Sequence, residues 1–300
     1  MRFFLVILSL CFTIQAQARE QIRIVGSSTL YPFITIAAER FGRISGHTPV
    51  VEATGTGGGF HLFCSGDSLR YPDIVNASRT IKPSEQELCK KNGVLNVKEL
   101  LIGYDGIVIA QSKEAQKFNL SKKDLFLALA KKLPQANQMV NNFYKTWKQI
   151  NPKLPDIKIE VYGPSFTSGT REVFIELVMN EFCHQSGCKE IREDGAYIEM
   201  SENDNLIIHK LAHNQKALGI ISFSLLNENS SIKAATINNV LPSKKSIING
   251  LYPLSRPLFI YINKDHQVLL PSLNAFIQEL VSPFSIGSDG YLTQKGLLTK

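Results

Sequence analysis

Short apolar segments alternate with amphipathic ones through most of the chain, and this alternation limits the folds that the chain can adopt. Residues 22–25, 49–52 and 107–110 are strand-like, and the first of them is followed by apolar positions at helical spacing over residues 30–41. A repeated strand-then-helix order favours an α/β fold with a mostly parallel sheet. In such folds, ligands bind where strands lead into helices. The 300 residues suffice for two domains.

The composition is that of an ordinary folded protein. Apolar residues make up 44% and charged residues 20% of the chain, which argues against disordered, collagen-like and low-complexity classes. The formal net charge is +7, and residues 81–158, with 14 Lys and 7 Asp and Glu, carry a surplus of the same size. Residues 111–158 of this stretch are predicted to be helical. The stretch is either an electropositive face that steers anions or docks a partner, or a set of solvated helices. Aromatic residues do not interleave with the lysines, so we expect no nucleic-acid partner.

The first 18 residues have the layout of a secretory signal peptide. A short positive start precedes an apolar run over residues 3–14, and Ala16-Gln17-Ala18 offers a small-x-small cleavage site. The run is shorter than the roughly 20 residues that span a bilayer. The alternatives are a buried N-terminal strand or helix and a lipoprotein signal at Cys11, where Leu10 is too large for the preceding position. We expect cleavage near Ala18 and an exported, soluble protein.

Removal of that leader leaves four cysteines, Cys64, Cys89, Cys183 and Cys188. An even number in an exported protein indicates disulfides, and four cysteines allow three pairings. We favour the two local pairings, Cys64 with Cys89 and Cys183 with Cys188. The alternative is a metal site that uses His184 with the thiols, but the spacing is not the short Cys-x-x-Cys pair of a zinc site. We therefore predict no metal site.

Four junctions at which a predicted strand leads into a loop are rich in Ser, Thr and Gly. They are Gly26-Ser-Ser-Thr-Leu30, Gly55-Thr-Gly-Gly-Gly59, Asn76-Ala-Ser-Arg79 and Thr167-Ser-Gly-Thr-Arg171. Hydroxyls and free amides at a helix start can bind an anion, although hydroxyls there also serve as ordinary caps. Glycines let the backbone approach a ligand. Arg79 and Arg171 add guanidinium groups whose paired donors fit a tetrahedral oxyanion, although either could form a surface ion pair instead.

The same loops lack the features of several enzyme classes. The glycines at 55–59 form no dinucleotide fingerprint, because Phe60 stands where the last glycine belongs, and no Lys-Ser/Thr pair follows them for a triphosphate. The chain contains no Gly-x-Ser-x-Gly elbow and no His-Glu-x-x-His motif. Donors without an adjacent base suit binding rather than hydrolysis. We therefore predict a binding protein that is not an enzyme and needs no cofactor.

Taken in order, these loops and several other segments resemble the periplasmic phosphate-binding proteins of the high-affinity phosphate ABC transporter. The segments are GSSTLYPF (26–33), GTGGGF (55–60), DIVNASR (73–79), YGPSFTSGTREVF (162–174), ENDN (202–205), ALGIISFSLL (217–226) and GLYPLSRPLFIY (250–261). They follow the order of the family over nearly the whole mature chain. The resemblance implies a periplasmic, monomeric protein that captures inorganic phosphate and delivers it to ABC permease subunits in the inner membrane.

The resemblance also implies a fold and a site. The fold is α/β and two-lobed, the type II or Venus-flytrap arrangement, in which each lobe is a mixed, mostly parallel sheet flanked by helices. The chain would cross between lobes near Asp105–Val108 and Pro257–Tyr261, so that lobe one is 19–106 plus 259–300 and lobe two is 107–258. Ligand positions carried over from the family are Ser28, Thr29, the amide of Leu30, Thr56, Gly57 and Ser78 in lobe one, and Ser168, Gly169 and Thr170 in lobe two.

Two departures from the family concern charge. Many members have Asp where Arg79 stands. Many also have an Arg shortly before the Ser-Gly-Thr, at the place of Pro164 and its neighbours, and in this chain Arg171 would replace that Arg. A carboxylate in the cleft would accept the proton of hydrogen phosphate and repel sulfate, which carries none. Asp204 or Asp73 would supply that carboxylate. Other tetrahedral oxyanions (sulfate, molybdate, tungstate) and an exported phosphatase-like enzyme therefore stay as alternatives.

Overall fold

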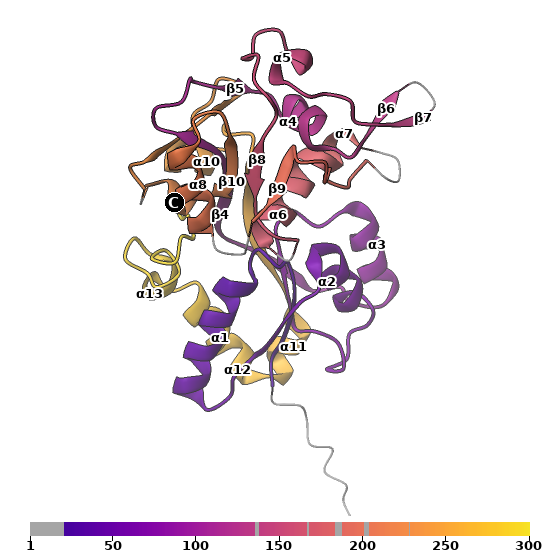
Figure 1. Cartoon of the computed structure of the whole chain (residues 1–300). Helices are drawn as coiled ribbons and strands as arrows, with labels where there is room; N and C mark the ends of the chain where they lie inside the picture. Colours follow the sequence, from indigo (N-terminus) through magenta and orange to yellow (C-terminus); the bar gives the residue numbers. More distant parts are fainter. Residues whose placement is uncertain (1–20, 136–137, 167, 184–187, 201–203, 228) are drawn as a thin grey trace, which may run out of the picture.

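The computed structural model describes residues 21–135, 138–166, 168–183, 188–200, 204–227 and 229–300. The predicted signal peptide, residues 1–18, lies outside them. None of the helices in the described ranges combines the length and the apolar character that a membrane crossing requires. Figure 1 shows two groups of helices, one above the other, each packed around its own part of a sheet.

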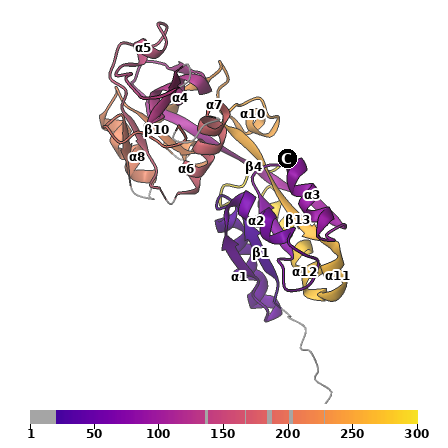
Figure 2. The ribbon, with the colours of Figure 1, turned by 90° about the vertical axis from the view of Figure 1, so that its right-hand side faces the viewer.

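A single mixed sheet runs through both groups of helices. Its strand order is β2-β1-β3-β13-β4-β10-β8-β9, and β11 also pairs with β4. Strands β4 (Val97–Ser112) and β13 (Ser255–Asn263) are neighbours near its centre and run antiparallel to each other. Figure 2 shows these two strands passing from one group of helices to the other, so the groups are two lobes joined by crossing strands.

Lobe one, the lower lobe in Figure 1, contains the first three strands. Strand β1 (Arg23–Gly26) pairs in parallel with β2 (Val50–Ala53) and with β3 (Ile74–Ala77), and β3 pairs antiparallel with β13. Its helices are α1 (Tyr31–Ser45), α2 (Gly55–Phe63), α3 (Pro83–Lys91), α11 (Lys264–Leu269), α12 (Pro271–Leu280) and α13 (Pro283–Ile286).

Lobe two holds the rest of the sheet. Strand β10 (Leu218–Ser222) pairs antiparallel with β4 and in parallel with β8 (Val161–Gly163), which pairs in parallel with β9 (Tyr197–Glu199). Its shorter strands are β11 (Ile232–Ala234), the pair β5 (Asn119–Leu120) with β12 (Thr236–Ile237), and the pair β6 (Lys132–Gln135) with β7 (Gln138–Asn141). Its helices are α4 (Lys122–Leu129), α5 (Trp147–Ile150), α6 (Gly169–Phe174), α7 (Asn180–Phe182), α8 (Asp204–His213), α9 (Phe223–Asn227) and α10 (Lys244–Ile248). The π-helical turn η1 (Ile175–Met179) joins α6 to α7.

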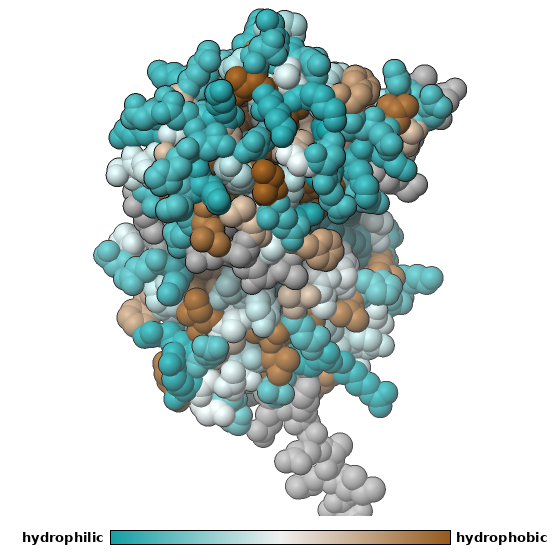
Figure 3. Space-filling view, viewed as in Figure 1, coloured by the Kyte–Doolittle hydropathy of each residue, from teal (hydrophilic) through white to brown (hydrophobic). Residues whose placement is uncertain are grey.

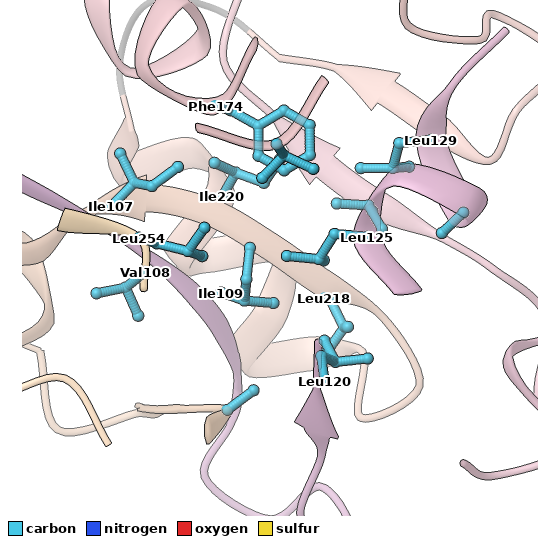
Figure 4. Packing of buried hydrophobic residues seen from close by; sticks show 14 of the residues in the cluster. Ile107, Val108, Ile109, Leu120, Leu125, Leu129, Phe174, Leu218, Ile220 and Leu254 are labelled. Carbon is cyan, nitrogen blue, oxygen red and sulfur yellow. The ribbon is translucent and has the colours of Figure 1, made fainter. Parts of the chain in front are cut away.

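Strand β4 changes partners at one point, and the hydrophobic cores change with it. Residues 97–106 pair with β13, whereas residues 107–112 pair with β10 and β11. The side chains of Ile107 and Leu254 pack in the core of lobe two, shown in Figure 4. Leu258, which the predicted boundary leaves in lobe two, packs in a core of lobe one. The second crossing therefore lies between Leu254 and Leu258.

The structure confirms the two-lobed α/β fold and adds two corrections of detail. Among the described strands of the main sheet, each lobe has two parallel and two antiparallel pairings, because the crossing strands β4 and β13 run against their neighbours. Residues 111–158 are not helical throughout, since α4 and α5 are separated by the β6–β7 hairpin. Pro134 in β6 has no backbone N–H and cannot continue a helix.

Both predicted disulfides are confirmed. The Cys64–Cys89 bond joins the end of α2 to α3, and the Cys183–Cys188 bond closes a short loop after α7. His184, the proposed partner of the thiols in a metal site, lies outside the described residues. In the part of the chain that the structure describes, no group of His, Cys, Asp and Glu side chains is placed to hold a metal ion.

Gly26 places the first candidate loop beside the end of β3. It has a φ of +135°, and a methyl group there would lie 2.0 Å from the carbonyl oxygen of Asn76. Only glycine permits this conformation and this approach. The backbone N–H of Ser27 donates to the same Asn76 oxygen at 2.9 Å. The loop at residues 27–30 and the loop that follows β3 are therefore adjacent, at the ends of parallel strands.

Candidate functional site

A cleft of about 540 Å³ lies between the two lobes. Its lining includes Ser28 and Thr29, which precede α1 in lobe one, and Ser168, Gly169 and Thr170, which begin α6 in lobe two. Asp105 and Gly106 of β4 also line it, as do Ser222, Ser224 and Lys295. Predicted ligand residues from both lobes thus share one cleft.

The two loops approach each other closely at Gly169. A methyl group on Gly169 would lie 3.5 Å from Cα of Thr29 and 3.6 Å from the carbonyl oxygen of Ser28. The Ser168 hydroxyl accepts a hydrogen bond from the backbone N–H of Thr170 at 3.2 Å, so Ser168 caps the helix in this state. The start of α6 therefore faces the loop of lobe one across a narrow gap.

Arg256 is a buried arginine at the point where β13 crosses between the lobes. It lies opposite Asp105 of β4 in the sheet register, and only 4% of its side chain is exposed. Its guanidinium donates hydrogen bonds to the hydroxyl of Thr29 in lobe one and to the carboxylate of Glu176 in lobe two. Its Nε has no hydrogen-bond partner among the described residues. A buried guanidinium with a spare donor beside a polar cleft is well placed to bind an anion.

Thr56 and Ser78 extend this network within lobe one. The hydroxyl oxygens of the two residues lie 3.0 Å apart, and the backbone N–H of Ser78 donates to the Thr56 hydroxyl at 3.2 Å. Both residues are buried. The Ser78 hydroxyl also donates to the Glu176 carboxylate at 3.3 Å. The predicted ligand residues after β2 and β3 are thereby connected, through Glu176, to Arg256.

Acidic side chains surround Arg256, and two of them bind a proton more readily than usual. Burial raises the pKa of Asp105, although Arg256 opposes the shift. Burial, and then the charge of Glu176, raise the pKa of Glu172, again against the effect of Arg256. Glu172 Oε2 has no hydrogen-bond partner in the described parts of the chain. Protonation of these carboxyl groups reduces the negative charge that an incoming anion meets.

The two arginines that the sequence suggests as ligands form ion pairs with nearby glutamates. Arg79 donates to both carboxylate oxygens of Glu85, at 2.7 and 2.9 Å. Arg171 donates to Glu199 at 2.6 Å, and this hydrogen bond lowers the pKa of Glu199. The Arg171 guanidinium also lies 5.1 Å from the ring centre of Tyr197. Arg171 thus ties α6 to β9, whereas Arg79 ties the loop after β3 to α3.

The structure does not bring Asp73 to the cleft. Asp73 precedes β3, at the opposite end of that strand from Ser78, and is fully buried. Its carboxylate lies 2.7 Å from Nδ1 of His266 and accepts a hydrogen bond from the backbone N–H of Arg23 at 2.7 Å. Asp204 begins α8, and its side chain lies outside what the structure describes.

The sequence motifs do not predict a role in the site for three charged residues of this network: Arg256, Glu176 and Glu172. Arg256 is the only charged residue in the segment GLYPLSRPLFIY, and a single charge between strand-like apolar residues is a usable signal. Glu172 and Glu176 follow the Thr-Ser-Gly-Thr-Arg loop at a spacing of four residues, which places two carboxylates on one face of a helix. That spacing is a second signal.

The Lys-rich stretch at 81–158 contributes no lysine to the cleft lining within the described residues. Several of its lysines pair with acidic side chains at the surface, among them Lys131 with Glu190 at 2.9 Å and Lys145 with Asp194 at 3.6 Å. On the face seen in Figure 3, hydrophilic residues cover most of lobe two. These pairs are typical of a solvated face.

Sequence comparison places the chain among known proteins over nearly its whole length. The sequence model of the PBP superfamily domain matches residues 13–283. The protein SphX of Synechocystis sp. is 33% identical over 282 residues, which cover 91% of this chain and 77% of that protein. The phosphate-binding protein PstS of Staphylococcus aureus strain USA300 is 32% identical over 256 residues, which cover 81% of this chain and 70% of that protein.

Solved structures give the same result for the fold. A possible phosphate-binding protein from Planctomyces limnophilus superposes with a TM-score of 0.76 at 27% identity, covering 93% of this chain and 92% of that one. An ABC-type phosphate transport receptor from Vibrio cholerae superposes with a TM-score of 0.68 at 21% identity, covering 93% of this chain and all of that one. At 21% identity, the similarity to the Vibrio cholerae receptor shows a shared fold alone.

Proposed function

This chain belongs to the PBP superfamily, and from that premise we propose that it is a substrate-binding protein that captures inorganic phosphate between its lobes for an ABC transporter. The names of its relatives support the ligand: one is called a phosphate-binding protein and another a possible phosphate-binding protein. The transport role is the one implied by the ordered segments that resemble the phosphate-binding proteins of the phosphate ABC transporter.

The observation that carries the proposal is the position of Arg256. Its buried guanidinium contacts Thr29 of lobe one and Glu176 of lobe two, and it keeps one donor, Nε, without a partner among the described residues. An oxyanion at this position would accept charge-assisted hydrogen bonds, which strengthen when lobe closure removes water. Closure around the anion follows from having its donors on both lobes.

We assign the remaining contacts to the loops that meet at the cleft. The ligand set is Ser28, Thr29, the amide of Leu30, Thr56, Gly57 and Ser78 from lobe one, with Ser168, Gly169 and Thr170 from lobe two. Arg79 and Arg171 hold these loops in place through Glu85 and Glu199. Asp204 stays the candidate for accepting the ligand's proton, because Asp73 is committed to His266. We keep the predicted lobes, 19–106 plus 259–300 for lobe one and 107–258 for lobe two, except that core packing moves the second boundary to between Leu254 and Leu258.

The proposal includes the cellular setting. The leader at residues 1–18 directs export and is cleaved near Ala18, and the mature protein works as a monomer in the periplasm with permease subunits in the inner membrane as its partners. It binds its ligand without turnover. Sulfate, molybdate and tungstate are the competing ligands, and ester hydrolysis is the competing activity.

Calorimetry with phosphate, sulfate, molybdate and arsenate tests the ligand. We expect tight binding of phosphate and of its isostere arsenate, and at least tenfold weaker binding of sulfate and molybdate. If the protein binds sulfate more tightly than phosphate, the proposed ligand is wrong although the proposed site stands. The proposal that the protein is not an enzyme would be overturned if the protein released phosphate from a generic phosphate ester faster than the ester hydrolyses in buffer alone.

A further inference from the structure

Glu176 occupies an unusual position on the helical segment that begins at the cleft. It lies in η1, the π-helical turn between α6 and α7. A π-helical turn inserts an extra residue into a helix, changes the direction of nearby side chains and is frequent at functional sites. The Glu176 side chain is 27% exposed, so it is not sealed in the interior of the protein.

The carboxylate of Glu176 binds the groups that we assign to the anion. It accepts a hydrogen bond from the guanidinium of Arg256 and another from the hydroxyl of Ser78, at 3.3 Å. Ser78 is in turn connected to Thr56. A carboxylate is an oxyanion with two acceptor oxygens, and it satisfies the same donors that a phosphate would need. In this state Glu176 therefore stands where part of an anionic ligand is expected.

Two further features of the Glu176 contact bear on how a ligand would enter. Ser78 follows β3 in lobe one and Glu176 lies in lobe two, so the hydrogen bond between them joins the lobes directly. Glu172 lies near Glu176, and their repulsion contributes to the raised pKa of Glu172. A phosphate beside the Glu176 carboxylate would likewise be repelled by its charge, unless Glu176 moves away from Arg256.

We propose, on the basis of the function proposed above, that Glu176 is a built-in competitor of the anionic ligand. Its carboxylate holds Arg256 and Ser78, and phosphate must displace it in order to bind. Glu176 then sets the affinity of the site, because each binding event includes the loss of its two contacts. It also prevents a buried guanidinium from being left without a counter-ion when the cleft is empty.

The direct test is calorimetry with phosphate and sulfate on the wild-type chain and on Glu176→Gln, which keeps the shape of the side chain and removes its charge. We expect Glu176→Gln to bind both anions about tenfold more tightly, the effect of removing one charge-assisted competitor. Glu181→Gln is the matched control, because Glu181 lies on the adjoining α7 but pairs with Lys122 at the surface. Its affinities should stay within twofold of wild type.

A second variant guards against misfolding of the first. Glu176→Asp keeps the charge but shortens the side chain by one methylene, so its carboxylate cannot reach Arg256 and Ser78 together, and we expect a smaller gain in affinity. Unchanged or weaker binding of both anions by a folded Glu176→Gln would overturn the inference alone. Loss of phosphate affinity with unchanged sulfate affinity would overturn it in favour of a proton acceptor. Absence of phosphate binding by the wild-type chain would overturn the proposed function as well.

Discussion

Arg256 of β13 and Asp105 of β4 are paired in the sheet register at the place where both strands cross between the lobes. Arg256, the residue that we expect to bind the anion through its positive charge, therefore lies on the crossing strands rather than within either lobe. Burial raises the pKa of Asp105 even though Arg256 is nearby, so Asp105 is a weak counter-ion. The guanidinium accordingly finds its partners in Thr29 and Glu176, one from each lobe.

Replacement of Arg256 by Lys should weaken phosphate binding by about 1.5–3 kcal/mol, roughly ten- to a hundredfold. Lysine keeps the positive charge, but it lacks the planar set of donors that reaches Thr29, Glu176 and the ligand together. Calorimetry measures the affinity, and a thermal melt confirms that the variant is folded. Arg23→Lys is the control, because Arg23 is partly exposed and pairs with Glu52 at the outer part of the sheet. Equal affinities of Arg256→Lys and wild type would remove Arg256 from the ligand set.

Arg171→Ala should change phosphate affinity by less than threefold, in contrast to Arg256→Lys. Arg171 already pairs with Glu199, whose side chain is 49% exposed, so we expect only about 1 kcal/mol of lost stability from the ion pair. Calorimetry and urea unfolding measure the two effects separately. A tenfold loss of affinity in a variant of wild-type stability would show that Arg171 contacts the ligand.

Local chemistry makes several features predictable from the sequence. The loops at 26–30, 55–59 and 167–171 stand out because hydroxyl and glycine residues follow apolar strands. Strands β1 and β2, which precede the first two loops, are neighbours in the sheet, whereas β8, which precedes the third loop, lies in the other lobe. The disulfides are predictable because each joins cysteines that are close in the sequence, separated by 25 and 5 residues. In each case the signal lies within one short segment.

The charged centre of the site is a different case, because its members are distant in the sequence. Arg256 is 80 residues from Glu176 and 227 residues from Thr29, and only the crossing of β13 brings them together. The partner of Arg171 is likewise fixed by the packing of β9, whereas Arg79 pairs with Glu85 only six residues further on. A residue type indicates that a guanidinium can bind an anion, but the nearest carboxylate decides whether it does.

Asp194→Asn should destabilise the protein at pH 7, and the difference should vanish in acid. A hydrogen bond from the buried Arg192 lowers the pKa of Asp194 to about 2, from a usual value of 3.8. A lowered pKa contributes stability that is complete above pH 3.8 and is lost as the pH falls through 2. Because 44% of the Asp194 side chain is exposed, solvent screening reduces the effect to about 1 kcal/mol.

Urea unfolding of Asp194→Asn and wild type at pH 7, 4 and 2 measures this dependence. Asp156→Asn is the control, since Asp156 and its partner Lys148 are both exposed and lie 3.9 Å apart. It should match wild type at each pH. A constant difference between Asp194→Asn and wild type at all three values would show that the loss comes from packing and not from the charge.

Removal of the Cys64–Cys89 bond should cost more stability than removal of the Cys183–Cys188 bond. A disulfide restricts the unfolded chain, and the restriction grows with the length of the closed loop. Separations of 25 and 5 residues correspond to about 3.5 and about 2 kcal/mol. The Cys64→Ser/Cys89→Ser and Cys183→Ser/Cys188→Ser double variants, unfolded in urea, give the two values. All four cysteines are packed in hydrophobic cores, so each loss also includes the burial of two hydroxyls, and the length of the closed loop makes the difference. A larger loss from the second pair would show that the loop after α7 is stabilised by the bond chiefly in the folded state.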